Sequence, residues 1–201
     1  RGAVGNPIVY LSEEKGMAHI TGAEQAKNWE KVDGDVYVAR FPNKFFGDYN
    51  PFTTLVSGDW YIATIIAHTG DVFLNGKSMY EVTSLDEVKN PVVNKSSWDP
   101  DFTVYTWYTE QDEKSDETVI YANFQGRNPN EEDVEISVRR HCFYPEAEGI
   151  SYITLSGFTV SKAATQWAPP TAYQEGMIGP HWSKGWVIEH CEVFESKCSG
   201  I

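Results

Sequence analysis

The residues best suited to ligand chemistry are tryptophans in one long loop. Residues 163–191 read AATQWAPPTAYQEGMIGPHWSKGWVIEHC and place Trp167, Trp182 and Trp186 between two strand-like runs. Three prolines in this stretch restrict the chain, so aromatic rings can be held in place at modest entropic cost. Binding residues concentrate on loops that a rigid scaffold supports. We therefore expect Trp167 and Trp182 either to bind a ligand or to cover the scaffold, and Trp186 to belong to the core.

Other reactive residue types form no recognisable motif. The five histidines lack the HxH or HExxH spacing of a metal site, and the acidic runs lack the spacing of a calcium loop. The sequence also contains no GxSxG motif, phosphate loop or dinucleotide fingerprint. We therefore expect no metal and no cofactor.

Charge, hydropathy and cysteine content narrow the class of protein. A formal net charge of −13 argues against a nucleic-acid partner, because a phosphate backbone requires a basic surface. The longest uncharged apolar run, residues 60–67, is too short for a membrane helix, which argues against a membrane partner. The three cysteines are odd in number and lack CxxC spacing. These features predict a cytoplasmic protein, whereas removal of a leader before Arg1 would make it extracytoplasmic.

The elements that must position these residues are β-strands. Short β-rich runs separated by Gly, Pro, Asn and Asp predict an all-β chain, and their density in residues 26–145 favours a sandwich or barrel. Asn75-Gly76 is the strongest hairpin signal. Residues 59–66 read as a strand, and residues 84–90 as the best helix candidate, with Ser84 and Glu87 as a capping box.

An internal repeat appears near the end of the chain. Apolar residues at 153, 155, 158 and 160 recur with the same internal spacing at 186, 188, 191 and 193, so that every position is offset by one constant interval. Strand, bend and strand in stacked copies form a parallel β-helix, although an ordinary pair of hairpins would give the same spacing. In a β-helix, residues 164–185 would leave the coil as one loop. Because a solenoid needs about three repeats and a cap, we expect the chain to be a segment of a longer protein.

Several long motifs resemble glycoside hydrolase family 120, namely PNKFFGDYNPF, GDWY, HTGDVFLNGKSMYEVT, TVIYANFQGRNPNEEDVEISVRRHCFYP, AATQWAPPTA and IGPHWSKGWVIE. The resemblance covers nearly the whole chain. It implies a right-handed parallel β-helix with an inserted antiparallel β-sandwich. It places an early coil in residues 1–25, the inserted β-sandwich in residues 26–145 and further coils in residues 146–201.

The resemblance implies a β-xylosidase that hydrolyses xylo-oligosaccharides with retention of configuration. Retaining glycosidases need two carboxyl groups about 5–5.5 Å apart. In this family those groups lie in later coils, so the resemblance implies no catalytic residue in this chain. Strand alternation independently predicts that Glu189 and Glu192 point outward, as surface residues do.

The resemblance also changes the interpretation of Trp60. By composition Trp60 is a core aromatic of a strand, but the matching GDW tryptophan of the family can help form the sugar subsite. Its ring would offer an apolar platform to a sugar. The expected sugar-binding residues are thus Trp60, Trp167 and Trp182, and the inserted domain can form a homo-oligomer. The alternatives are a non-catalytic carbohydrate-binding or assembly module and another β-helix glycosidase or lyase.

Overall fold

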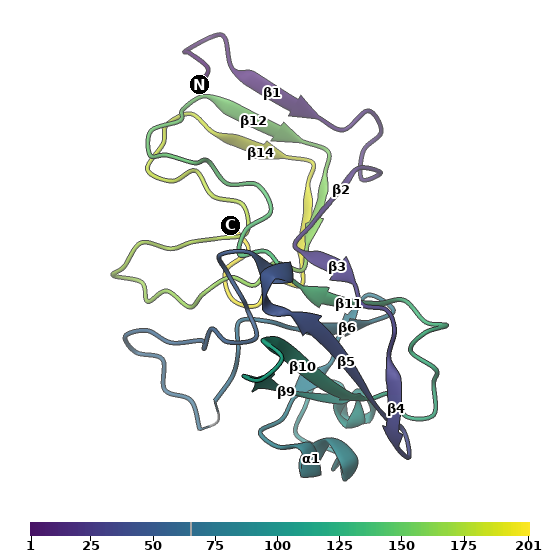
Figure 1. The fold of residues 1–201 in the computed structure, drawn as a ribbon. Coiled ribbons are helices and arrows are strands. Elements are labelled where there is room, and N and C mark those ends of the chain that lie inside the picture. Colours follow the sequence, from purple (N-terminus) through teal and green to yellow (C-terminus); the bar gives the residue numbers. More distant parts are fainter. Residues whose placement is uncertain (65) are drawn as a thin grey trace. The chain divides into compact units, whose positions relative to one another are not determined.

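The computed structural model describes residues 1–64 and 66–201, and strands dominate both parts of the chain (Figure 1). The all-β prediction is confirmed. The chain forms two compact units, which are described separately below. Unit 1 comprises Arg1–Ala23, Ser57–Tyr61 and Arg139–Ile201, and unit 2 comprises Glu24–Val56 and Ile62–Val138.

Unit 1 contains two parallel three-stranded sheets. One has the order β1 (Ile8–Leu11), β12 (Ile153–Ser156), β14 (Val187–Glu189), and the other has the order β2 (His19–Thr21), β13 (Thr159–Ser161), β15 (Glu192–Phe194) (Figure 1). Leu155 pairs with Ile188 and Val160 with Val193, in parallel. Both pairs have the offset of the sequence repeat, so the predicted repeat is confirmed as adjacent strands in register. A pair of hairpins is excluded, because hairpin strands run antiparallel.

The bends between these strands recur at the interval of the repeat. Residues with a left-handed backbone form equivalent pairs, Tyr152 and Gly185, Gly157 and His190, and Lys162 and Glu195, with φ between 51° and 81°. A single residue in this region redirects a strand sharply, and only glycine adopts it without a steric cost. The corners of successive passes therefore coincide, which keeps the strands between them in register.

A third face of unit 1 is built from short backbone pairings. Phe143 forms a parallel bridge with Ile178, and the Ile178 N–H donates to the Gly200 carbonyl at 3.1 Å. The Met177 N–H likewise donates to the Ser199 carbonyl at 3.2 Å. The prediction that residues 164–185 form one loop is therefore wrong, because the chain returns to the scaffold at Met177 and Ile178. Two loops result, one on each side of this contact.

One corner of unit 1 is closed by a backbone ladder. The Arg139 N–H donates to the Gly22 carbonyl at 2.9 Å, and the Ala164 N–H donates to the Arg139 carbonyl at 2.8 Å. The Lys197 N–H extends the ladder to the Ala163 carbonyl at 3.1 Å. Gly22 is required here, since a Cβ atom at this position would lie 2.6 Å from the Ala163 Cα.

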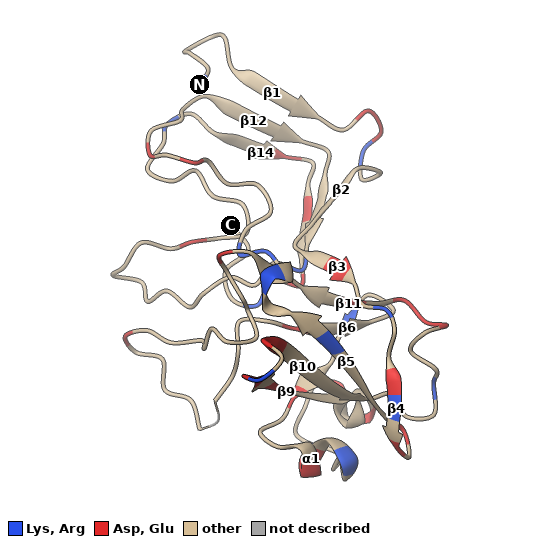
Figure 2. Ribbon diagram, in the orientation of Figure 1, with Lys and Arg blue, Asp and Glu red and all other residues tan. Residues whose placement is uncertain are grey.

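The core of unit 1 lies between these faces. Its fully buried members are Leu155, Val160, Ala163, Met177 and Ile178. Trp186 packs against this cluster with its ring centroid 5.8 Å from that of Phe143, and its indole N–H donates to the Ile150 carbonyl at 2.7 Å. These contacts match the core position predicted for Trp186. Strands β1 and β12 carry no charged residue (Figure 2).

Unit 2 has two sheets around an aromatic core, an arrangement that fits a β-sandwich. The five-stranded sheet has the order β4 (Glu30–Asp33), β5 (Val36–Pro42), β10 (Glu117–Asn123), β9 (Thr106–Asp112), β8 (Tyr80–Glu81). The four-stranded sheet has the order β3 (Ala23–Gln25), β11 (Val134–Ser137), β6 (Val72–Leu74), β7 (Lys77–Ser78). The β5–β10 and β9–β10 pairs are antiparallel as predicted, whereas β8 runs parallel to β9. Trp107 and Phe52 are among the largest buried side chains, with ring centroids 5.6 Å apart.

The sequence motifs of unit 2 predicted one hairpin and one helix, and the structure contains both. The Asn75-Gly76 hairpin is confirmed, because Leu74 pairs with Lys77 and both turn residues have positive φ. Ser84 caps α1 (Leu85–Lys89) as predicted, and the Glu87 carboxylate accepts the N–H of Thr83 at 2.8 Å and the hydroxyl of Ser84 at 3.2 Å. Two short 3₁₀ helices complete the helical elements of the described chain, η1 (Asn43–Phe46) and η2 (Pro100–Val104).

The strand predicted at residues 59–66 is wrong for residues 59–64 and 66, none of which belongs to a strand, and residue 65 lies outside the described residues. Among the described residues, no helix has the length and apolar character to cross a membrane.

The packing of unit 1 predicts unequal effects of one substitution on neighbouring strands. Leu155 is fully buried on β12, whereas Leu11 on β1 is 67% exposed. We expect Leu155→Ala to lower the free energy of unfolding by about 2–5 kcal/mol, because it leaves a cavity. Leu11→Ala is the matched control and should change it by less than about 0.5 kcal/mol. Urea denaturation of both variants measures this difference, and equal effects would contradict the assigned core.

Candidate functional site

A short segment of unit 1, Ser57–Tyr61, presents Trp60 to solvent. Trp60 is 67% exposed and has φ 66°, a left-handed conformation that is unusual for a bulky residue. The Tyr61 N–H donates to the Gly58 carbonyl at 3.1 Å and so closes a tight turn around Trp60. The segment therefore holds a large aromatic side chain outward on a compact turn.

The loop that follows β13 fixes this segment in place. The Ser57 N–H donates to Gln166 Oε1 at 3.0 Å, and the indole N–H of Trp167 donates to the Asp59 carbonyl at 3.1 Å. Gln166 Oε1 also accepts the N–H of Trp167 at 2.9 Å, so one amide oxygen connects both chain segments. The Ser57–Tyr61 segment is thus anchored to this loop at two points.

Trp167 contacts the turn closely through its ring. A Cβ atom at Gly58 would lie 2.8 Å from Trp167 Cδ1, so only glycine allows this approach. Tyr61 covers Trp167 from another direction, with ring centroids 6.1 Å apart. The contacts of Trp167 are therefore those of a positioning residue. A direct sugar contact of Trp167 stays a prediction.

Trp182 belongs to a different set of contacts in unit 1. Its ring is 68% exposed and stacks on Tyr173, with centroids 5.5 Å apart and an interplanar angle of 23°. The structure thus joins two of the expected sugar-binding residues, Trp60 and Trp167, through the backbone of Asp59. Trp182 instead stacks on Tyr173, whose ring centroid lies 5.5 Å from that of His181.

The acidic and sulfur-containing side chains of unit 1 offer little reactivity. Glu189 and Glu192 are exposed on β14 and β15, as strand alternation predicts. Burial raises the pKa of the Cys142 thiol to about 12, which leaves almost no thiolate near neutral pH. No group of three or more His, Cys, Asp or Glu side chains in the described part of the chain could hold a metal ion.

Sequence reasoning missed Gln166, Ser57 and Gly58 as parts of this site. The contacts of Gln166 with Ser57 and of Trp167 with Asp59 join residues that are far apart in the sequence, so no local pattern could predict them. The available signal was a polar residue beside a tryptophan at the start of a proline-stiffened loop.

Comparison with known proteins matches this chain to one protein family and to one solved structure. The family described as glycoside hydrolase 120, insertion domain, matches residues 26–136. A solved structure of XylC in complex with xylose is 46% identical to this chain and superposes with a TM-score of 0.89. That match covers 94% of this chain but 31% of the XylC chain. No curated protein matches the sequence.

The family match spans more than half of the 201 residues, and the XylC match extends the likeness to nearly all of them. The resemblance inferred from the sequence motifs is therefore confirmed. The chain belongs to glycoside hydrolase family 120.

Proposed function

We propose that this chain is a segment of a β-xylosidase-like glycoside hydrolase that acts on xylo-oligosaccharides with retention of configuration. Two findings support the proposal, membership of glycoside hydrolase family 120 and the likeness to XylC, whose structure contains xylose. The chain spans about a third of XylC, so the proposed activity is that of a longer protein.

The proposed scaffold of that enzyme is a right-handed parallel β-helix. In this proposal residues 1–25 form an early coil, residues 146–201 form the next two coils, and residues 26–145 form the inserted β-sandwich, apart from residues 57–61 and 139–145, which belong to unit 1. The two parallel sheets of unit 1, the bridge between Phe143 and Ile178 and the regularly repeated left-handed corners support this architecture. The inserted domain is also the proposed contact between subunits of a homo-oligomer.

Trp60 is the proposed platform for the sugar ring. The observation that carries this assignment is the hydrogen bond from the Trp167 indole to the Asp59 carbonyl, next to a Trp60 side chain that is 67% exposed. An exposed ring fixed in advance binds the C–H face of a sugar with little loss of side-chain entropy.

The proposed catalytic carboxyl pair lies outside this chain. We expect the purified 201-residue chain to bind xylobiose but to release no xylose from xylobiose or from aryl xylosides. Reducing-sugar and chromogenic assays measure this. Turnover that survives repurification would show that the catalytic carboxyls lie within these residues and would overturn this part of the proposal.

Removal of the Trp60 ring tests the sugar platform. We expect Trp60→Ala to weaken the binding of xylotriose by about tenfold, because one aromatic platform contributes on the order of 1 kcal/mol. Isothermal titration calorimetry measures the affinity. Trp98→Ala is the matched control, since Trp98 in unit 2 is 86% exposed. Equal affinities of the Trp60→Ala variant and the unmodified chain would contradict the assignment.

A second substitution tests the positioning role of Trp167. Trp167→Phe keeps an aromatic ring but removes the indole N–H that binds the Asp59 carbonyl. We expect greater mobility of Trp60, measured as a lower ¹⁵N order parameter of its indole, and a several-fold loss of xylotriose affinity. Trp29→Phe is the control, because the Trp29 indole also donates to a backbone carbonyl at 3.1 Å, that of Ala26 in unit 2. Unchanged Trp60 dynamics in Trp167→Phe would refute the role.

A further inference from the structure

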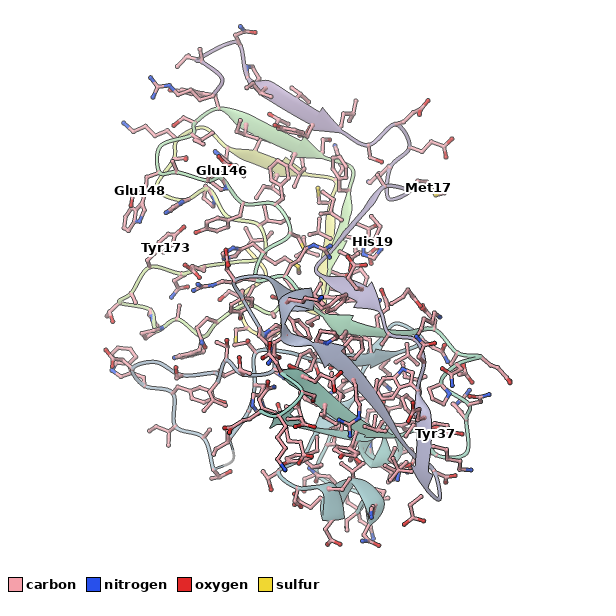
Figure 3. The ribbon with its side chains drawn as sticks, viewed as in Figure 1. Met17, His19, Tyr37, Glu146, Glu148 and Tyr173 are labelled. Atoms are coloured by element: carbon pink, nitrogen blue, oxygen red, sulfur yellow. The ribbon has the colours of Figure 1, made fainter. Side chains whose placement is uncertain are left out.

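A second aromatic surface lies in the loops of unit 1. Tyr173 precedes the return of the chain at Met177, and Trp182 follows it, so two separate loops bring these rings together. Figure 3 labels Tyr173 among the loops of unit 1, away from its strands. Trp182 is 68% exposed while Tyr173 is half-buried beneath it, which leaves the outer face of the Trp182 ring open to solvent.

The backbone that presents Trp182 is strained. His181 has φ 46° and Trp182 has φ 57°, so two consecutive bulky residues adopt the left-handed conformation. Strain of this kind persists where the surrounding structure enforces it, often at ligand sites. The strain holds the Trp182 ring outward instead of letting it pack into the core.

Polar side chains lie next to the Tyr173 ring. The hydroxyl groups of Tyr144 and Tyr173 form a hydrogen bond with each other. The Tyr144 ring stacks on His141 with centroids 4.0 Å apart and lies 5.3 Å from the His181 ring. Burial and the Tyr173 hydroxyl raise the pKa of Tyr144, so this hydroxyl remains protonated and able to donate.

One imidazole nitrogen of this cluster is buried without a hydrogen bond, since His181 Nδ1 has no hydrogen-bond partner among the described residues. His141 Nε2, in contrast, lies 3.5 Å from the Glu175 carboxylate, which is also paired with Arg140. Buried polar atoms are rarely left unsatisfied in native proteins, so His181 Nδ1 points to a ligand with hydroxyl groups.

We propose that Trp182, Tyr173 and His181 form a second carbohydrate subsite, which binds a neutral pyranose ring of a xylo-oligosaccharide. A pyranose matches both parts of the cluster, since its C–H face stacks on an indole and its hydroxyls both donate and accept hydrogen bonds. An acidic sugar is disfavoured, because Glu175 neutralises Arg140 and the chain carries a net charge of −13. The inference rests on the proposed function and extends it to a site apart from Trp60.

The test is a titration of the ¹⁵N-labelled 201-residue chain with xylotriose, followed through the tryptophan indole signals. We expect the Trp182 signal to shift in a saturable way that is independent of Trp60→Ala. In isothermal titration calorimetry, which does not need the Trp182 signal, Trp182→Ala should weaken this second binding event by about tenfold, and Tyr173→Phe, which removes only a hydroxyl, by several-fold. Trp98→Ala is the control for loss of an exposed tryptophan. Trp182→Phe keeps a ring and should retain most of the affinity, which separates loss of stacking from misfolding.

The outcomes separate the two proposals. A Trp60 signal that shifts while the Trp182 signal stays fixed overturns the second subsite and leaves the proposed function standing. Absence of any response to xylotriose overturns both. A stronger response of Trp182 to trigalacturonate than to xylotriose overturns the assignment of a neutral sugar.

Discussion

The hydrogen-bonded register between successive passes of unit 1 is the constraint on which the rest of the structure depends. Every backbone N–H and C=O of a parallel strand must find a partner on the neighbouring pass, so the strands and corners cannot change length independently. The interval between Leu155 and Ile188, which is the same as that between Val160 and Val193, expresses this constraint. The extra residues can leave only at the corners, and the aromatic loops begin there.

The sugar-binding hypothesis depends on what those loops hold in place. The only side-chain donor of Trp167 is bonded to the Asp59 carbonyl. Trp167 therefore acts by fixing the conformation of the turn that carries Trp60. Trp182 is presented differently, through the left-handed backbone of His181 and Trp182 and through its stacking on Tyr173. The two tryptophans with the largest exposure in unit 1 are thus both presented by strained backbone, and neither fills a gap in the core.

The sequence predicted the features that local patterns encode. Alternating apolar residues predicted the paired strands β12–β14 and β13–β15, and Asn75-Gly76 predicted its hairpin, because each pattern has few alternative conformations. The return of the chain at Met177 and the contact of Gln166 with Ser57 were not predictable, since both depend on partners distant in sequence. Residues 59–66 look like a strand by composition, but the contacts of Asp59 and Ser57 with the neighbouring loop override that propensity.

The ladder of Gly22, Arg139, Ala163 and Lys197 has a consequence for protein engineering. The chain leaves unit 1 after Ala23, returns to it for Ser57–Tyr61 and re-enters it at Arg139, where the Arg139 N–H donates to the Gly22 carbonyl. A segment inserted between Ala23 and Arg139 must therefore begin and end at neighbouring positions. A foreign module grafted at this corner would replace unit 2, but it would also have to supply the Ser57–Tyr61 segment of unit 1, which carries Trp60.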